Sequence, residues 1–205
     1  VRFMAASGRP IRSLKKEFAG FENRMLFLGE NGAKVVDKDD IIYEELMPKE
    51  TYLEITQTID QMKYGSASML HLSGKEGCYY LSTIDPDYLE WLKPYYPIMI
   101  EVEDFAEVEG DIYKVGANFP PEHLQEISQQ LTQMIPGVVA LTSGFECLDV
   151  MLDYVDKGNA LEQACTALGI ELSQVLAFGD NFNDKQMLER AGLAVVPENA
   201  KEEIK

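Results

Sequence analysis

Apolar and polar positions divide the chain into three stretches with different periodicities. In residues 1–44, and again in residues 146–205, short continuous apolar runs alternate with helical patterns. Such runs are typical of parallel strands, because helices cover both faces of a parallel sheet. Residues 45–145 instead mix amphipathic helices with antiparallel hairpins, such as the one expected over residues 67–82. The pattern predicts a doubly wound parallel-sheet α/β core, formed by the first and last stretches, with an inserted α+β domain.

The last stretch carries the clearest alternation of strand and helix. It is expected to contain, in order, a helix over residues 158–168, a strand at 175–178, a helix over 184–191 and a strand at 193–196. This βαβ order implies a parallel sheet with right-handed crossovers. Ligands of such sheets bind beyond the carboxyl ends of the strands. Asp180 and Ser7 each follow a predicted strand, so we expect them to share one site.

Charge and cysteine content narrow the classes of partner. The chain has 35 acidic and 18 basic residues and a net charge of −17. Nucleic acids attract basic surfaces, so a nucleic-acid partner is excluded. No apolar run reaches the roughly 20 residues of a membrane span, so a membrane partner is not expected. The three cysteines have neither disulfide nor zinc spacing, which favours reduced, buried thiols and a cytoplasmic location. The sequence does not indicate an oligomeric state.

The loop Gly179-Asp180-Asn181-Phe182-Asn183-Asp184 is the sharpest chemical signal. Two carboxylates and two carboxamides fall within five residues at the end of a buried strand. A hard cation such as Mg²⁺, held by one or two carboxylates and by phosphate oxygens of a substrate, would relieve the repulsion between the carboxylates. A polar loop in which Asp or Asn only caps the following helix explains the same pattern equally well.

Three weaker signals lie elsewhere in the core stretches. The hydroxyl of Ser7 and the following Gly8-Arg9 stand at a strand end, where they could cradle a phosphoryl group or form an ordinary capped turn. Lys157 stands at a helix start, where the macrodipole disfavours a cation, so either a bound phosphate or simple surface exposure accounts for it. Asn31-Gly32 could offer a carboxamide to a substrate, or could be only a hairpin turn.

In this order, the four segments resemble the motifs of Cof-type phosphatases in the haloacid dehalogenase superfamily. Ser7-Gly8-Arg9 resembles the second motif, whose hydroxyl binds the phosphoryl group, and Asn31-Gly32-Ala33 is similar to a turn near the substrate. Lys157-Gly158 resembles the third motif, whose lysine steadies the nucleophile and the phosphoryl charge. Residues 45–145 would then be the mobile cap that selects the substrate.

The loop at 179–184 resembles the fourth motif, which holds Mg²⁺. The resemblance implies that Asp180 is a direct ligand, that Asp184 is a second or outer ligand, and that Asn183 supports the site by hydrogen bonding. The implied catalytic residues are Ser7 and Lys157. The implied substrate-binding residues are Ser7, Gly8, Arg9, Asn31, Lys157 and Asn183.

The first motif of the family, an Asp-x-Asp pair on the first strand, has no counterpart, since no aspartate precedes Asp37. The resemblance therefore implies a core truncated at both ends, with the nucleophile outside the chain as given. The expected activity is Mg²⁺-dependent hydrolysis of small phosphomonoesters such as sugar phosphates, through an aspartyl-phosphate. The alternatives are an inactive relative that binds Mg²⁺ and a phosphorylated ligand, a phosphomutase, and an unrelated doubly wound or response-regulator-like module.

Overall fold

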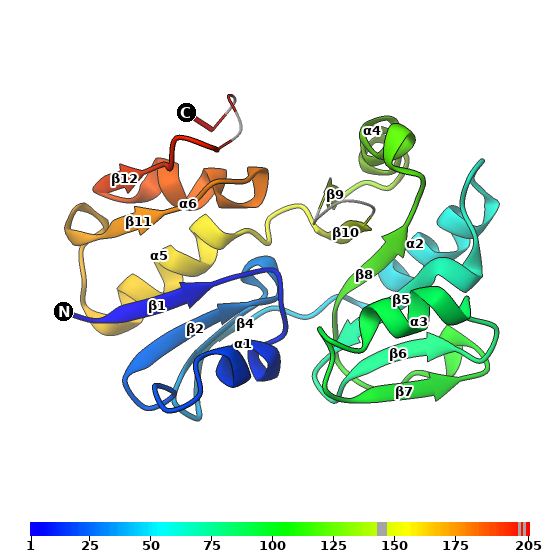
Figure 1. Cartoon of the computed structure of the whole chain (residues 1–205), viewed down its shortest axis with the longest axis horizontal. Coiled ribbons are helices and arrows are strands. Elements are labelled where there is room, and N and C mark those ends of the chain that lie inside the picture. Colours follow the sequence, from blue (N-terminus) through cyan, green and yellow to red (C-terminus); the bar gives the residue numbers. More distant parts are fainter. Residues whose placement is uncertain (143–146, 201, 203) are drawn as a thin grey trace. The chain divides into compact units, whose positions relative to one another are not determined.

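The structure is a computed structural model that describes residues 1–142, 147–200, 202 and 204–205. The chain forms two compact units (Figure 1). Unit 1 contains Val1–Glu45 and Tyr154–Lys205, and unit 2 contains Leu46–Asp153. The sequence placed the second boundary after residue 145. In the structure, the strand that follows pairs inside the sheet of unit 2, so this unit extends to Asp153. The interpretation of the units as core and cap stays a prediction.

The described strands of unit 1 form two sheets. The first has the order β1-β2-β3-β4, in which β1 pairs parallel with β2 and the other pairs are antiparallel. The second pairs β11 parallel with β12. The bounds are β1 Phe3–Ala6, β2 Met25–Gly29, β3 Lys34–Asp37, β4 Asp40–Glu44, β11 Leu176–Phe178 and β12 Leu193–Val195. The predicted α/β class with parallel strands is confirmed.

Three α-helices accompany these strands in the described part of unit 1: α1 (Ile11–Glu17), α5 (Lys157–Leu168) and α6 (Lys185–Arg190). Helix α5 begins at an Asp156 cap and ends at Gly169, whose φ of 64° is the left-handed conformation that glycine adopts readily. Its apolar residues, including Leu161 and Cys165, pack with Ala177 of β11 and with residues of α6 and β1. Helix α5 therefore ties the two sheets of unit 1 to one core.

Strands β1 and β11 both pack on α5, yet no strand ladder joins them among the described residues (Figure 1). Each has a free edge, and each exposes large apolar side chains. Phe3 of β1 is 66% exposed, and Leu176 and Phe178 of β11 are 51% and 64% exposed. Parallel strands are normally covered on both faces, so the exposed faces of β1 and β11 depart from that pattern, and their two sheets are not joined as the single predicted parallel sheet would be.

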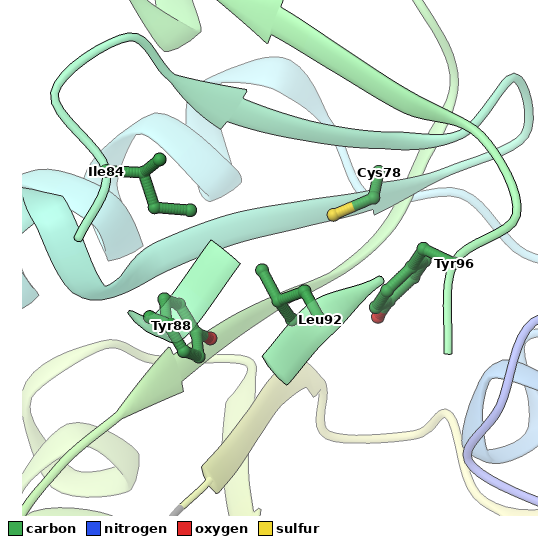
Figure 2. Close-up of a cluster of buried hydrophobic side chains, with 5 residues drawn as sticks. All are labelled: Cys78, Ile84, Tyr88, Leu92 and Tyr96. Atoms are coloured by element: carbon green, nitrogen blue, oxygen red, sulfur yellow. The ribbon is translucent and has the colours of Figure 1, made fainter. Parts of the chain in front are cut away.

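Unit 2 is built on a six-stranded sheet with the order β7-β6-β5-β8-β10-β9. Its strands are β5 Leu70–Gly74, β6 Cys78–Leu81, β7 Met99–Val102, β8 Ile112–Asn118, β9 Val138–Thr142 and β10 Cys147–Leu152. Its helices are α2 Lys49–Gln61, α3 Pro86–Leu92 and α4 Leu124–Met134. Figure 2 shows Tyr88 and Leu92 of α3 beside Cys78 of β6, in a cluster that also contains Ile84 and Tyr96.

A buried polar network lies beside this cluster. The ring nitrogens of His71 lie 2.8 Å from the Tyr88 hydroxyl and 2.9 Å from the Tyr96 hydroxyl. Burial, and then the positive charge of Lys114, lower the pKa of His71 to about 3, so the ring is neutral near pH 7. Lys114 forms a buried ion pair with Asp149, with 2.9 Å between Nζ and Oδ2. Both ring nitrogens of His71 are thus engaged inside unit 2, which is a structural role.

Candidate active site

The four sequence segments singled out above lie within unit 1, next to the ends of its strands. Ser7 follows β1, the Glu30–Gly32 turn (a short 3₁₀ helix, η1) follows β2, and Asp180 lies two residues after β11. Lys157 is the first residue of α5. Hydrogen bonds and an ion pair between these segments bring all four into one region of the unit.

The Ser7 loop is fixed by backbone hydrogen bonds. The Ser7 amide donates to the Leu28 carbonyl at 2.9 Å, and the Ser7 carbonyl accepts from the Asn31 amide at 3.1 Å. The Ser7 hydroxyl oxygen accepts from the Arg9 amide at 3.2 Å. The Arg9 guanidinium pairs with Glu17 of α1 at 2.9 Å, on side chains that are 40% and 60% exposed. The structure thus gives Arg9 a surface partner, and its predicted phosphate contact stays a prediction.

Lys157 and Asp184 form the buried centre of the site. Their Nζ and Oδ1 atoms lie 2.5 Å apart, and the side chains are 5% and 9% exposed. This partner explains the cation at the start of α5, which the helix dipole alone would disfavour. The other carboxylate oxygen of Asp184 accepts the amides of Asp180 and Asn181 at 3.0 and 3.1 Å. One carboxylate therefore holds the lysine and closes the 180–184 loop.

Asp180 is placed differently from Asp184. It is exposed, and within the described residues no hydrogen bond or ion pair engages its carboxylate. The oxygens of Asp184 are already engaged by Lys157 and two amides. Of the two roles that the resemblance implied, second ligand or outer ligand of Mg²⁺, this arrangement suits the outer ligand. One free carboxylate fits Mg²⁺, because this ion commonly binds one or two carboxylates and keeps water and substrate oxygens as its other ligands. The described residues contain no group of three His, Cys, Asp or Glu side chains arranged for a metal.

Asn31 and Asn183 meet across the site. The Asn183 side-chain amide donates to the Asn31 carboxamide oxygen at 2.9 Å. Asn31 is 2% exposed. The structure thus joins two residues that the sequence assigned to substrate binding. Whether either contacts a substrate stays a prediction.

Two supporting residues were missed by sequence reasoning. Asp156 caps α5 by accepting the Asn159 amide at 2.7 Å, and so fixes the helix turn that carries Lys157. An Asp directly before a helical pattern is a recognisable cap signal. Asn181 accepts the Phe182 amide at 2.9 Å and caps the short turn at Phe182–Asp184. Its carboxamide was noted in the motif but given no role.

Unit 1 is thus an α/β scaffold that gathers a buried lysine, a free carboxylate and a hydroxyl beside its strand ends, the architecture of an α/β enzyme acting on a charged ligand. The sequence model of the haloacid dehalogenase-like hydrolases matches residues 1–205, and the chain belongs to this family. The resemblance drawn from the four motifs is confirmed.

The comparisons with individual proteins agree with this assignment. The 5-amino-6-(5-phospho-D-ribitylamino)uracil phosphatase YbjI of Escherichia coli K12 is 27% identical over 201 residues, which cover 98% of this chain and 73% of that protein. The structure of SMU.1108c from Streptococcus mutans UA159 matches with a TM-score of 0.91 at 27% identity, covering 100% of this chain and 77% of that chain. The subclass IIB sugar phosphatase BT4131 shares the fold, with a TM-score of 0.82 at 16% identity over 100% of this chain and 76% of that chain. The predicted enzyme class, a phosphatase of this superfamily, is confirmed.

In the part of the chain that the structure describes, no helix combines the length and apolar character needed to cross a bilayer.

Proposed function

We propose that the protein is a Mg²⁺-dependent phosphomonoester hydrolase that acts on small phosphorylated metabolites, such as sugar phosphates, through an aspartyl-phosphate. One observation carries the proposal. Asp184 joins Lys157, at 2.5 Å, to the backbone amide of Asp180, at 3.0 Å, so one side chain holds both the cation and the loop that carries the free carboxylate. Phosphoryl transfer depends mainly on such positioned charges.

Four residues of unit 1 have a defined part in this proposal. The Ser7 hydroxyl donates a hydrogen bond to a phosphoryl oxygen, and the Lys157 ammonium balances the negative charge of the phosphoryl group. Asp180 holds Mg²⁺, which when bound neutralises charge on the phosphoryl oxygens. Asp184 keeps Lys157 and the Asp180 loop in place. The charge of Lys157 attracts the phosphoryl group strongly, because the lysine side chain is only 5% exposed and charges interact more strongly where water is excluded.

The nucleophile is proposed to lie on a strand outside the chain as given. The edges of β1 and β11 support this, because both strands pack on α5 and, among the described residues, each is paired on one side alone. A strand pairing with both edges would continue the sheet between β1 and β11 and would end beside Ser7 and Asp180. An aspartate at its carboxyl end would then face the phosphoryl site.

The substrate class is supported by the relatives. The Escherichia coli relative is named for a small phosphorylated ribityl compound. Unit 2, inserted between the two parts of unit 1, is proposed as the cap that selects the substrate. Cys78, Cys147 and Cys165 are buried, and we propose a cytoplasmic location on the scattered spacing of these three cysteines in the sequence.

Phosphate release from a panel of small phosphomonoesters, with and without Mg²⁺, tests the proposal. The protein used should include any segment encoded ahead of Val1. We expect hydrolysis that requires Mg²⁺, that is lost in Asp180→Asn, and that is retained in Lys185→Met, which removes an exposed lysine next to the site loop. An absence of release across the whole panel, from folded protein in the presence of Mg²⁺, would refute the proposed activity.

A further inference from the structure

The Glu30–Gly32 turn has an unusual backbone. Its three residues have φ angles of 53°, 56° and 114°, and two of them, Glu30 and Asn31, are not glycine. Both are almost fully buried, with 1% and 2% exposure. Residues with side chains avoid this region, and where a fold enforces it the strain commonly serves a site.

The turn contacts the Ser7 loop through its backbone. The Asn31 amide donates to the Ser7 carbonyl at 3.1 Å, and the Glu30 amide donates to the Arg9 carbonyl at 3.0 Å. A Cβ placed on Gly8 would lie 2.7 Å from the Asn31 carboxamide oxygen. The Asn31 side chain therefore packs directly on the loop that carries the Ser7 hydroxyl.

The turn also contacts the start of α5 and the Asn183 loop. A Cβ on Gly32 would lie 2.3 Å from the Asp156 carbonyl oxygen and 2.9 Å from the Lys157 backbone nitrogen, so the turn lies against the peptide bond that leads into Lys157. The Asn31 carboxamide oxygen accepts from Asn183 at 2.9 Å. Three segments that are far apart in the sequence thus meet on one strained turn.

We propose that the Glu30–Gly32 turn is the positioning element of the site, and that Asn31 acts by holding the Asn183 loop in register with Ser7 and Lys157. Asn31 is then a positioning residue that works through Asn183. The effect of Asn31 on catalysis rests on the proposed phosphatase function, whereas the link that the hydrogen bond forms between Asn31 and the Asn183 loop does not.

Amide hydrogen exchange, resolved residue by residue by NMR, tests the link on the chain as it stands. The reporters are the amides of Asp180 and Asn181, which Asp184 holds. The test variant is Asn31→Gly, which removes the carboxamide and tolerates the positive φ. The control is Lys38→Gly. Lys38 has the same φ of 56° in an exposed turn between β3 and β4, so both variants change the backbone alike.

We expect Asn31→Gly to accelerate exchange at the two reporters about tenfold, as the loss of one hydrogen bond implies, and Lys38→Gly to leave them unchanged. Asn183→Ala should accelerate exchange about as much in the wild-type background, and less than about twofold in the Asn31→Gly background, because the two side chains form one link. Equal exchange in Asn31→Gly and Lys38→Gly, or equal effects of Asn183→Ala in both backgrounds, would overturn the proposal.

Kinetics of a form that includes any segment encoded ahead of Val1 provides the second measurement. A positioning role predicts that Asn31→Gly lowers kcat by on the order of 10-fold to 100-fold and leaves KM within about twofold. A rise in KM with unchanged kcat would instead indicate that Asn31 binds substrate, and would overturn the positioning role. If the wild-type protein releases no phosphate, the proposed function fails, and the exchange result alone decides the link.

Discussion

The buried Lys157–Asp184 pair should respond sharply to loss of the lysine. Lys157→Met keeps the length of the side chain and removes its charge, so Asp184 is left as a buried carboxylate without a cation. Breaking a buried pair in this way costs about 3–5 kcal/mol. Two amides still donate to Asp184 at 3.0 and 3.1 Å, which places the expected loss near the lower end, at about 3 kcal/mol. That is a large share of the roughly 5–15 kcal/mol of a typical domain.

Urea unfolding followed by circular dichroism measures this loss. Fluorescence of Trp91, the single tryptophan, reports on unit 2 in the same samples, so an effect confined to unit 1 can be recognised. The matched control is Lys185→Met. Lys185 lies next to Asp184 in the sequence, its side chain is 55% exposed, and it is 3.9 Å from Glu189. Its removal should change stability by less than about 0.5 kcal/mol.

A double variant separates lost charge balance from lost packing. Asp184→Asn in the Lys157→Met background removes the unpaired charge and keeps an oxygen that can accept the two amides. The double variant should therefore lose less free energy of unfolding than the sum of the two single variants. A Lys157→Met protein within about 1 kcal/mol of Lys185→Met, or strictly additive single effects, would refute the reasoning that this pair is buried and coupled.

Three further predictions concern other positions. The folded-state pKa of His71, about 3, lies below the unfolded value of 6.5, so the contribution of the neutral ring to folding stability is complete above pH 6.5. This stability is lost at about 1.4 kcal/mol per pH unit as the pH falls towards 3. The free energy of unfolding, measured with urea between about pH 4 and 7, should therefore depend less on pH in His71→Gln than in the wild type. Gly32→Ala should lower the free energy of unfolding by about 2 kcal/mol or more, because its Cβ would lie 2.3 Å from the Asp156 carbonyl oxygen. The control is Gly20→Ala, where φ is 90° and a Cβ would meet no atom within 4 Å, so only the smaller cost of placing alanine at a positive φ should appear. Thermal melting of the two variants measures both changes. Asp180→Asn should reduce Mg²⁺-dependent phosphate release on the order of 100-fold without changing the melting temperature, since this carboxylate is exposed; undiminished release would contradict its role.

Much of unit 1 could be predicted because its local patterns agree with its fold. The apolar runs before Ser7 and Asp180 indicated strands, and the carboxyl ends of parallel strands are where ligands bind. The helical pattern after Lys157 matched α5 to within one residue. The sequence thus indicated which segments to expect near one another.

The pairings within the site could not be predicted, because they join residues that are distant in sequence. Asn31 and Asn183 are 152 positions apart, and no local pattern encodes their hydrogen bond. The salt bridge of Lys157 was invisible for the same reason, so a bound phosphate and simple surface exposure were the two explanations that the sequence offered for its charge. In the structure Asp184 supplies the counter-charge.

Some elements of the fold also escaped prediction. Strand β4 has only a short apolar core, Ile41-Ile42-Tyr43, and its Ile41 is 50% exposed, so it lacks the signature of a buried strand. Strand β7 is a four-residue edge strand soon after Pro97. The buried Lys114–Asp149 pair breaks the rule that charged residues face solvent, and only the register of β8 and β10 reveals it.

The two points where unit 2 joins unit 1 lie close together. Glu45 ends the first part of unit 1, Tyr154 begins the second, and the Tyr154 hydroxyl donates to the Glu45 carboxylate at 3.1 Å. The 108 residues of Leu46–Asp153 thus leave unit 1 and return to it at neighbouring positions, as a long surface insertion does. An insertion whose two ends lie side by side can be replaced by one of another length or fold without moving the surrounding helices and strands of unit 1.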